Sequence, residues 1–442
     1  MSELLILIEG KLIGRVRSGT GGRLSLQYED SWLQAGASSH RLSVSMPLAR
    51  VEYPQRLVLP YLWNLLPENP NVLQRWAQQY HVSAASPFKL LAHVGADVPG
   101  AAQFIPPERL AEFSTTGPPS IDWISKNELA ERLQQLRSDV TAVRRPEDIG
   151  KMSLPGAQAK TAYYYDGRRD RWGIPGGRTP TTHIIKPCVP GFDGLVENEH
   201  LCQNIATRCG LPAANSFVLS LDEPYIVVER YDRLPPPADS LSVQRIHQED
   251  ICQALGLMPG RKYQEDGGPG IATIVALIRR TSSAPETDVD RFLQANILNW
   301  LIGGTDAHAK NYSLLVGTGD EIRLAPLYDL SSQLPYPTLI AQRVAMKIGD
   351  HYDIARIGAT DWRRLALACA IEEEKVLSMA IDMARALPDH ISGARQESLK
   401  ERLSKSVVNP LAEQLVAHAQ RCLDLLTGAP HSMRPRRKTA RH

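Results

Sequence analysis

The chain has 442 residues, 43% of them hydrophobic and 22% charged, and its 31 glycines and 32 prolines are spread along its length. This composition excludes a disordered, collagen-like or coiled-coil protein and leaves room for two or three domains or one large two-lobed fold. The formal net charge is +2, but five cations lie among the last nine residues, so the rest carries about −3 and is not a basic nucleic-acid-binding surface.

Residues 1–106 are predicted to form a small α+β unit. Two β-type runs at residues 4–8 and 11–16 flank Glu9 and Gly10, which is typical of a hairpin. Residues 23–28 and 41–46 alternate like strands. Helical spacing follows over residues 59–80, interrupted by prolines, and over residues 88–94.

Residues 107–149 are predicted to be a linker and a helix. Residues 113–120 are rich in Ser, Thr, Gly and Pro, which is typical of a linker. Ser125 with Glu128 three residues later has the spacing of a capping box, and the helix that it opens extends to about Arg137.

Residues 150–246 are predicted to be rich in strands and residues 247–428 to be mostly helical. Strands are expected at 161–165, 182–186, 216–221 and 225–230, and beyond residue 247 only one hairpin, at 312–316 and 321–324, interrupts the helical spacing. This order indicates an α+β fold of two lobes with a cleft between them. Residues 429–442 are expected to be a disordered basic tail, either free or touching nucleic acid or an acidic partner.

The localisation is predicted from what the sequence lacks. The start does not follow the basic, apolar and small-residue order of a signal peptide, and no apolar run reaches the ~20 residues that cross a bilayer. The six cysteines show neither a CxxC pair nor zinc-ligand spacing. We therefore expect a cytoplasmic protein that binds no membrane.

The strongest candidate for chemistry is the segment with Asp306, His308, Lys310 and Asn311, followed 18 residues later by Asp329. Phosphoryl transfer needs a carboxylate that accepts the proton of the substrate hydroxyl and oxygen ligands that hold Mg²⁺ against the nucleotide phosphates. The spacing D-x-x-x-x-N with a later Asp is the one that protein kinases use. Taken alone, the segment could equally be a solvated polar loop, and a hydrolytic metal site using His308 is a third interpretation.

Three upstream features come in the order that a nucleotide site needs. The loop at 153–160 contains a glycine but matches neither common phosphate-binding fingerprint. Lys186 ends a strand, and the helix expected over 195–209 places Glu197 on the face of Leu201; kinases position the α/β-phosphates with such a strand lysine and helix glutamate. Alone, Lys186 is more often a surface lysine. The strand at 225–230 then runs into a polar turn that is either an adenine-binding hinge, with Tyr231 over the ring, or an ordinary charged strand end.

Together these segments resemble the HipA family of serine/threonine kinase toxins. The likeness covers nearly the whole chain, through residues 42–48, 64–68, 87–91, 153–160, 183–187, 197–199, 228–233, 248–256, 306–311 and 325–330. It implies a two-lobed protein-kinase-like fold, the use of ATP and Mg²⁺, and a HipB-like helix-turn-helix antitoxin that binds operator DNA with the toxin as co-repressor. It also implies phosphorylation of a serine on an aminoacyl-tRNA synthetase, glutamyl-tRNA synthetase being the best-known target, with inhibited translation, growth arrest and persistence.

The resemblance also implies roles for individual residues. Asp306 would be the catalytic base, Asn311 and Asp329 the Mg²⁺ ligands, and Lys186 a ligand of the ATP phosphates. Ser153 matches the serine that family members autophosphorylate, and the added charge would move its loop out of the ATP site and switch the enzyme off. The remaining nucleotide contacts would be a phosphate loop of Pro155, Gly156, Ala157, Gln158, Ala159 and Lys160, a hinge of Glu229, Arg230 and Tyr231, and the flanking residues His308, Lys310 and Tyr328.

Two positions depart from the family pattern. Ala159 stands where Glu is common, and Gly304 where Asn often precedes the catalytic Asp. Neither change removes a proton acceptor or a metal ligand, so we expect activity to survive. Two alternatives remain: a kinase-like enzyme that modifies a small molecule or lipid, and a catalytically weak co-repressor subunit.

Overall fold

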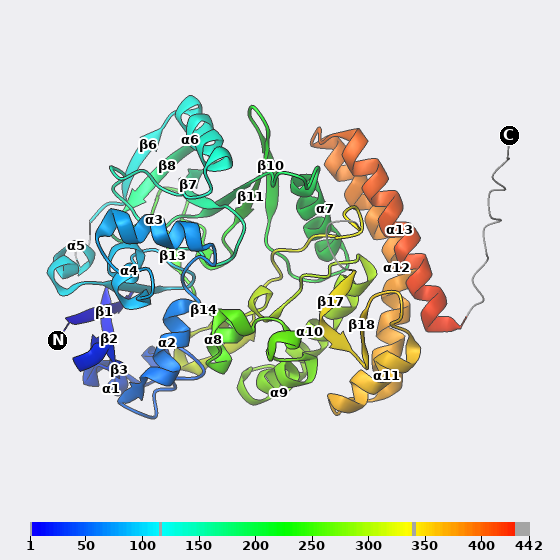
Figure 1. Ribbon diagram of the computed structural model, residues 1–442, viewed down its shortest axis with the longest axis horizontal. Coiled ribbons are helices and arrows are strands. Elements are labelled where there is room, and N and C mark those ends of the chain that lie inside the picture. The colour runs from blue at the N-terminus through cyan, green and yellow to red at the C-terminus, as the bar shows by residue number, and fades with distance from the viewer. Residues whose placement is uncertain (1, 115–116, 338–341, 429–442) are drawn as a thin grey trace.

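The computed structural model describes residues 2–114, 117–337 and 342–428. Three parts follow one another in the chain: an N-terminal unit (residues 2–114), a β-rich lobe (117–246) and a helical lobe (247–428 without its gap) (Figure 1). This is the expected α+β architecture. The basic tail expected over residues 429–442 lies outside the described residues.

The N-terminal unit is built on a five-stranded antiparallel sheet in the order β4-β3-β2-β1-β5. The expected hairpin is confirmed, because β1 and β2 pair across Glu9 and Gly10, which both have positive φ as a tight type I′ turn requires. Strand β1 is buried on both faces, with Leu4 in the main core of the unit and Leu5 in a smaller cluster with Phe113. The elements are β1 (Ser2–Ile8), β2 (Lys11–Ser18), β3 (Leu24–Tyr28), α1 (Asp30–Gln34), β4 (Glu52–Pro54), α2 (Gln55–Trp63), α3 (Pro70–Tyr80), α4 (Pro87–Val94), β5 (Ala102–Ile105) and α5 (Leu110–Ser114).

The strand expected over residues 41–46 is wrong. The structure has only an isolated bridge between Ser43 and Met46 there. Glu249 of the helical lobe is the reason, since its carboxylate accepts hydrogen bonds from the Ser43 hydroxyl and the Val44 N–H, both at 2.6 Å. The alternating pattern therefore marks a buried segment that is bonded to a side chain and not to a neighbouring strand.

The β-rich lobe contains a six-stranded antiparallel sheet in the order β10-β11-β9-β7-β8-β6. Strands β6 and β8 were not expected. Strand β6 lies in the range 107–149 predicted as a linker and a helix, so part of that range belongs to this sheet, and β8 contains Pro175, a residue that argues against a strand. The elements are β6 (Ser120–Ile124), α6 (Lys126–Ser138), β7 (Thr161–Asp166), β8 (Arg171–Gly176), β9 (His183–Pro187), α7 (Leu195–Arg208), β10 (Ser216–Ser220), β11 (Pro224–Glu229), β12 (Arg233–Leu234) and β13 (Gln244–Arg245).

The cap predicted for α6 is present in part. The Ser125 hydroxyl accepts a hydrogen bond from the Glu128 N–H at 3.1 Å. The Glu128 side chain does not close the box but accepts from the Arg132 guanidinium at 3.0 Å, one helical turn further on.

The helical lobe begins with a small sheet. Strands β14, β15 and β16 pair in that order, so the expected hairpin gains a third strand, and β17 with β18 forms a second hairpin that was not expected. Strand β17 buries Val344, Ala345 and Met346 in succession, so it lacks the alternation on which the prediction relied. The elements are β14 (His247–Asp250), α8 (Ile251–Leu255), α9 (Ile271–Thr281), α10 (Pro285–Leu301), β15 (Ser313–Val316), β16 (Ile322–Leu324), β17 (Arg343–Ile348), β18 (His351–Asp353), α11 (Ala359–Ala368), α12 (Glu373–Lys400) and α13 (Lys405–Thr427).

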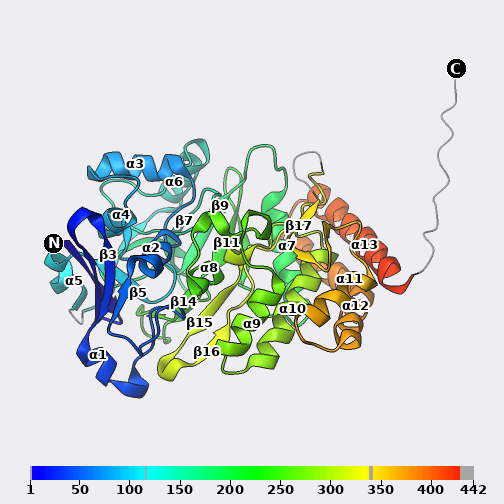
Figure 2. The same ribbon diagram turned by 60° about the horizontal axis from the view of Figure 1, so that its bottom comes forward.

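The N-terminal unit packs against both lobes. Its core continues into the β-rich lobe through Leu154 and Ala162, and Glu249 attaches it to the helical lobe. The N-terminal sheet and the pair α12–α13 lie at opposite ends of the molecule (Figure 2). Among the described helices, none combines the length and the apolar character that a membrane span needs.

Candidate active site

A cavity of about 480 Å³ lies between the two lobes, within the usual size range of small-ligand pockets. Of the predicted nucleotide residues, Ala159 does not line it and packs against the core of the N-terminal unit instead. The predicted residues that do line the cavity are Pro155, Gly156, Ala157, Gln158, Lys160, Lys186, Glu229, Arg230, Tyr231, Asp306, His308, Lys310, Asn311, Tyr328 and Asp329.

Lys186 lines the cavity and contacts two carboxylates there. Its position in β9 sends the ammonium group into the cleft, where it donates to Glu199 Oε1 at 2.8 Å and to Asp329 Oδ1 at 2.6 Å. Burial lowers the pKa of Lys186, but the charges of Asp329 and Glu199 outweigh burial and raise it overall. Lys186 is therefore a permanent cation held between the two lobes.

The helix glutamate that pairs with Lys186 is Glu199 and not the expected Glu197. Both glutamates are buried in α7, but two residues along a helix turn a side chain by about 200°, so they face different ways. Glu199 shares its face with Gln203, whose amide donates to Glu199 Oε1 at 3.2 Å. Leu201 lies on the side of α7 that packs into the core of the helical lobe. Sharing a face with Leu201 therefore does not predict which glutamate faces the cleft.

A second cation, Lys160, lies beside Lys186. Its ammonium group donates to the Pro155 carbonyl at 2.8 Å, and burial together with the charge of Lys186 lowers its pKa to about 8. Burial raises the pKa of Asp329, but Lys186 and Lys160 outweigh it and hold that pKa well below the usual range. Asp329 therefore stays ionised between two lysines, as a ligand of a divalent cation must.

The loop predicted to be catalytic bends back on itself. The carbonyl of Asp306 accepts from the His308 N–H at 2.8 Å and from the Asn311 side-chain amide at 2.9 Å. Burial raises the pKa of the Asp306 carboxyl, which suits a group that must take up a proton. Burial also lowers the pKa of His308 to about 3, so its ring is neutral, and its buried Nδ1 has no partner among the described residues.

The departure at Gly304 has a local explanation. A Cβ atom at this position would lie 2.5 Å from Oδ1 of Asn299, and the Gly304 N–H donates to the Asn299 carbonyl at 2.7 Å. The side chain of Asn299 is itself fixed by a hydrogen bond to the Ala295 carbonyl at 2.9 Å. An asparagine from α10 thus fills the place that a side chain at 304 would take.

The predicted phosphate loop is braced by the N-terminal unit. Gly156 has φ +106 and its carbonyl accepts from the Glu68 N–H at 3.1 Å; a Cβ there would meet Lys160 Nζ at 2.5 Å, so only glycine fits. Ser153 does not line the cavity. It is fully buried, and its hydroxyl donates to the Leu65 carbonyl at 2.7 Å.

At the predicted hinge, the Arg230 side chain is engaged by the protein itself. The guanidinium of Arg230 is buried against Asp232, with Nε to Oδ1 at 3.0 Å, and donates to the Val98 carbonyl at 2.9 Å. The ring of Tyr231 lies 5.6 Å from that of Tyr328 at a 30° tilt, so two aromatic faces border the hinge end of the cavity.

Lys310, a predicted nucleotide residue, is engaged by the protein itself, donating to Asp250 Oδ2 at 2.8 Å and to Asn64 Oδ1 at 2.7 Å. The wall residues that were not predicted include Asn64, Glu68, Asp250 and Lys262. Lys262 pairs with Glu68 at 2.6 Å. Glu68 and Asn64 come from the N-terminal unit, and the only signal for them in the sequence is that both lie in a segment matched by the family resemblance.

The oxygen donors suit Mg²⁺. The amide N–H of Asn311 is used within the loop and Lys186 takes one oxygen of Asp329, so one oxygen of each remains for a hard cation. Within the described residues no cluster of three or more His, Cys, Asp or Glu side chains could hold a metal. The residues therefore fit a cation shared with nucleotide phosphates and not one enclosed by the protein.

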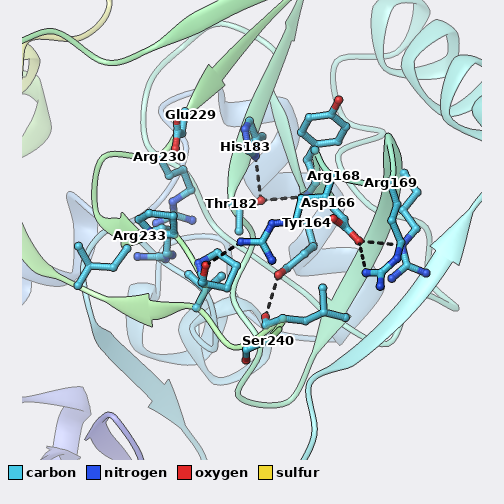
Figure 3. Close-up of a pocket in the computed structure, with 18 of the residues that line it drawn as sticks. Tyr164, Asp166, Arg168, Arg169, Thr182, His183, Glu229, Arg230, Arg233 and Ser240 are labelled. Atoms are coloured by element: carbon cyan, nitrogen blue, oxygen red, sulfur yellow. Dashed lines mark hydrogen bonds and ion pairs between the residues drawn. The ribbon is translucent and has the colours of Figure 1, made fainter. Parts of the chain in front are cut away.

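A second cavity of about 800 Å³ shares the lining residues Glu229 and Arg230 with the first (Figure 3). Three of the arginines that line it already have partners within the protein. Arg168 donates to the Pro237 carbonyl at 3.2 Å, and Arg169 and Arg171 pair with Asp166 at 3.2 and 3.1 Å. None of the acidic residues predicted for catalysis lines it. The smaller cavity is therefore the candidate active site.

The two lobes, with a lysine–glutamate pair and an Asp/Asn/Asp set facing one cleft, define a protein-kinase-like fold. Two family models match the sequence: the HipA N-terminal domain over residues 4–105 and the HipA-like C-terminal domain over residues 152–391. The chain belongs to the HipA family.

Similar proteins agree with this assignment. Y4mE of Sinorhizobium fredii, named as a candidate kinase, is 32% identical over 93% of this chain and 96% of its own. The serine/threonine-protein kinase toxin HipA of Shewanella oneidensis is 28% identical over 84% of each chain. The solved complex of the Shewanella oneidensis HipA and HipB with operator DNA contains a chain that matches with a TM-score of 0.82 and 25% identity, over 96% of this chain and 98% of that one.

Proposed function

We propose that this protein is an ATP-dependent serine/threonine-protein kinase. The observation that carries the proposal is the bridge from Lys186 to both Glu199 and Asp329, because it joins a strand lysine, a helix glutamate and a metal-binding aspartate across one cleft. Asp306 and Asn311 line the same cavity. A protein that only binds a partner has no physical need for this set.

Each group has a part in the transfer. Lys186 and Lys160 attract and orient the phosphates, and the Tyr231 and Tyr328 rings border the adenine end. Asn311 and Asp329 would hold Mg²⁺, which supplies charge neutralisation at the phosphates when bound. Asp306 accepts the proton of the substrate hydroxyl while the bond from that oxygen to the γ-phosphorus forms and ADP leaves.

The kinase proposal is tested with purified protein, Mg·ATP and a general serine-containing protein substrate. We expect phosphate on serine or threonine in the wild type by mass spectrometry, and a loss of about 10²-fold or more in Asp306→Asn. The asparagine keeps an oxygen for the Tyr263 hydrogen bond, so the variant tests the proton acceptor without removing this contact. Equal phosphate in both proteins, or none in either, contradicts the proposal.

We further propose that the kinase is the toxin of a HipBA-type system and works in the cytoplasm with a HipB-like antitoxin. The likeness to a HipA chain solved with HipB and operator DNA supports this partner. The described part of the chain is not basic enough for strong DNA binding on its own, so operator contact would come mainly through the antitoxin. A helix-turn-helix protein encoded beside this gene should co-purify with the chain and shift operator DNA; an antitoxin that binds DNA but never the chain refutes the partnership.

The expected target is a serine on an aminoacyl-tRNA synthetase, with glutamyl-tRNA synthetase the first to test. Treatment with the kinase and Mg·ATP should add a phosphoserine and abolish charging of tRNA with glutamate, whereas Asp306→Asn should leave charging unchanged. Autophosphorylation at Ser153 requires its loop to leave the buried position that it has here, because the hydroxyl is enclosed and bonded to Leu65. A synthetase that stays active and unmodified refutes the choice of target but not the kinase proposal.

A further inference from the structure

Tyr263 makes a contact with the proposed catalytic base that the sequence did not indicate. Its hydroxyl donates a hydrogen bond of 2.6 Å to Oδ1 of Asp306. In the described parts of the chain, this is the one side-chain hydrogen bond made to the Asp306 carboxylate. Tyr263 comes from the irregular segment between α8 and α9, where no periodic pattern points to a functional residue.

The tyrosine approaches the carboxylate from outside the cavity. Asp306 and His308 line the 480 Å³ cavity, as does the neighbouring Lys262, whereas Tyr263 does not. Tyr263 therefore does not occupy the place of a substrate. It holds one carboxylate oxygen from behind and leaves the other without a partner among the described residues.

Tyr263 is fixed to the catalytic loop by its surroundings. Its ring meets the His308 ring edge-on, with centroids 5.0 Å apart at 80°. The Ala309 N–H donates to the Lys262 carbonyl at 3.2 Å, and the Gly268 N–H donates to the Tyr263 carbonyl at 2.9 Å. A Cβ at Gly268 would lie 2.6 Å from that carbonyl oxygen, so the turn that carries the tyrosine needs glycine.

The hydrogen bond also affects the charge of the carboxylate. Burial raises the pKa of Asp306, and the bond from Tyr263 opposes this by stabilising the ionised form. Burial and the nearby charge of Asp306 raise the pKa of Tyr263, so the tyrosine stays protonated and remains a donor.

We infer that Tyr263 is a positioning residue for the transfer reaction: it holds one oxygen of Asp306 so that the other is presented to the acceptor hydroxyl in the cavity. The inference rests on the proposed kinase function.

The test compares Tyr263→Phe with Tyr165→Phe. The control loses a similar tyrosine–carboxylate hydrogen bond, from Tyr165 to Asp170 at 3.0 Å, in the β-rich lobe. In the Tyr263 variant kcat should fall about tenfold, while the KM for ATP stays within about twofold. The control should match the wild type. An unchanged kcat overturns the inference.

A second measurement is independent of activity. Carbon NMR of aspartate side chains reports the surroundings of the Asp306 carboxyl directly, with its signal assigned by its absence in Asp306→Asn. At one fixed pH the signal should shift in Tyr263→Phe and stay in place in Tyr165→Phe. If the wild type transfers no phosphate the proposed function fails, but this signal still decides whether Tyr263 contacts the carboxyl group, and an unchanged Asp306 signal in Tyr263→Phe refutes it.

Discussion

Replacement of Glu199 by glutamine should weaken phosphoryl transfer far more than the same replacement at Glu197. Both residues are buried in α7, but only Glu199 touches Lys186, at 2.8 Å. Glutamine has nearly the same size and keeps an oxygen acceptor, so the change removes charge and leaves the packing of the helix intact. Glu197→Gln is therefore a matched control within the same helix.

The magnitude follows from the distance and from the second partner of the lysine. At 2.8 Å and an effective dielectric constant of about 20, the Coulomb attraction is about 6 kcal/mol before desolvation is subtracted. Breaking a buried pair typically costs about 3–5 kcal/mol. Asp329 remains to neutralise Lys186, at 2.6 Å, so we expect less, about 2 kcal/mol, which corresponds to about a 30-fold loss of kcat/KM.

The assay is steady-state transfer from Mg·ATP to a protein substrate, with urea unfolding of each variant measured in parallel. Glu199→Gln should lose about 30-fold in kcat/KM and Glu197→Gln less than about threefold. If the two variants lose equally, or if Glu197→Gln loses more, the assignment of the partner of Lys186 is wrong. A loss that follows unfolding alone would also refute the reasoning.

Three further results are expected. The KM for ATP should rise from pH 7 to pH 9, because burial and Lys186 lower the pKa of Lys160 to about 8 and the lysine loses its charge over this range. Lys160→Met should remove this rise, and a rise that persists in the variant contradicts the role of Lys160 at the phosphates. Burial raises the pKa of Glu249 to about 8, so the folded protein binds this proton more tightly than the unfolded chain and its stability falls as pH rises from about 4.5 to about 8. Urea unfolding of the wild type should show this loss, a few kcal/mol at most, relative to Glu249→Gln. Parallel curves of stability against pH for the two proteins would refute the reasoning. Ser153→Asp should expel its loop, because a carboxylate cannot donate to the Leu65 carbonyl, so nucleotide binding by calorimetry should fall at least tenfold and the loop should become sensitive to protease; tight binding in this variant would count against the buried position.

Much of the candidate site could be predicted because its residues sit at points of strong local pattern. Lys186 ends a strand, and Asp306, Asn311 and Asp329 keep a spacing in which each residue type matches one chemical need. The structure places all four on the wall of one cavity.

The rest depends on tertiary contacts that leave no periodic signal. Glu199 and not Glu197 pairs with Lys186 because of the side of α7 that faces the cleft. The apolar residues of the helix indicate only the side that is buried in the helical lobe. Tyr263 lies in an irregular segment, so its approach to Asp306 has no local pattern.

Two errors in the fold have the same origin. Strand β8 tolerates Pro175 because at this position it pairs only with β6, beyond the residues that pair with β7. Residues 43–45 are ordered by the side chain of Glu249 and not by a strand partner. Local propensity describes neither case, since the deciding partner lies far away in the chain.

The N-terminal unit spans the mouth of the cleft on one side. It holds the helical lobe through Glu249 and Lys310, and it holds the phosphate loop of the other lobe through Gly156. A wide rotation of one lobe away from the other, which lets nucleotide enter and leave many two-lobed enzymes, would have to break the bonds of the N-terminal unit to one lobe or to the other. Under the proposed function we therefore expect the short loop before β7 to govern nucleotide exchange, and we expect removal of the first hundred residues to free the lobes and dismantle the site at once.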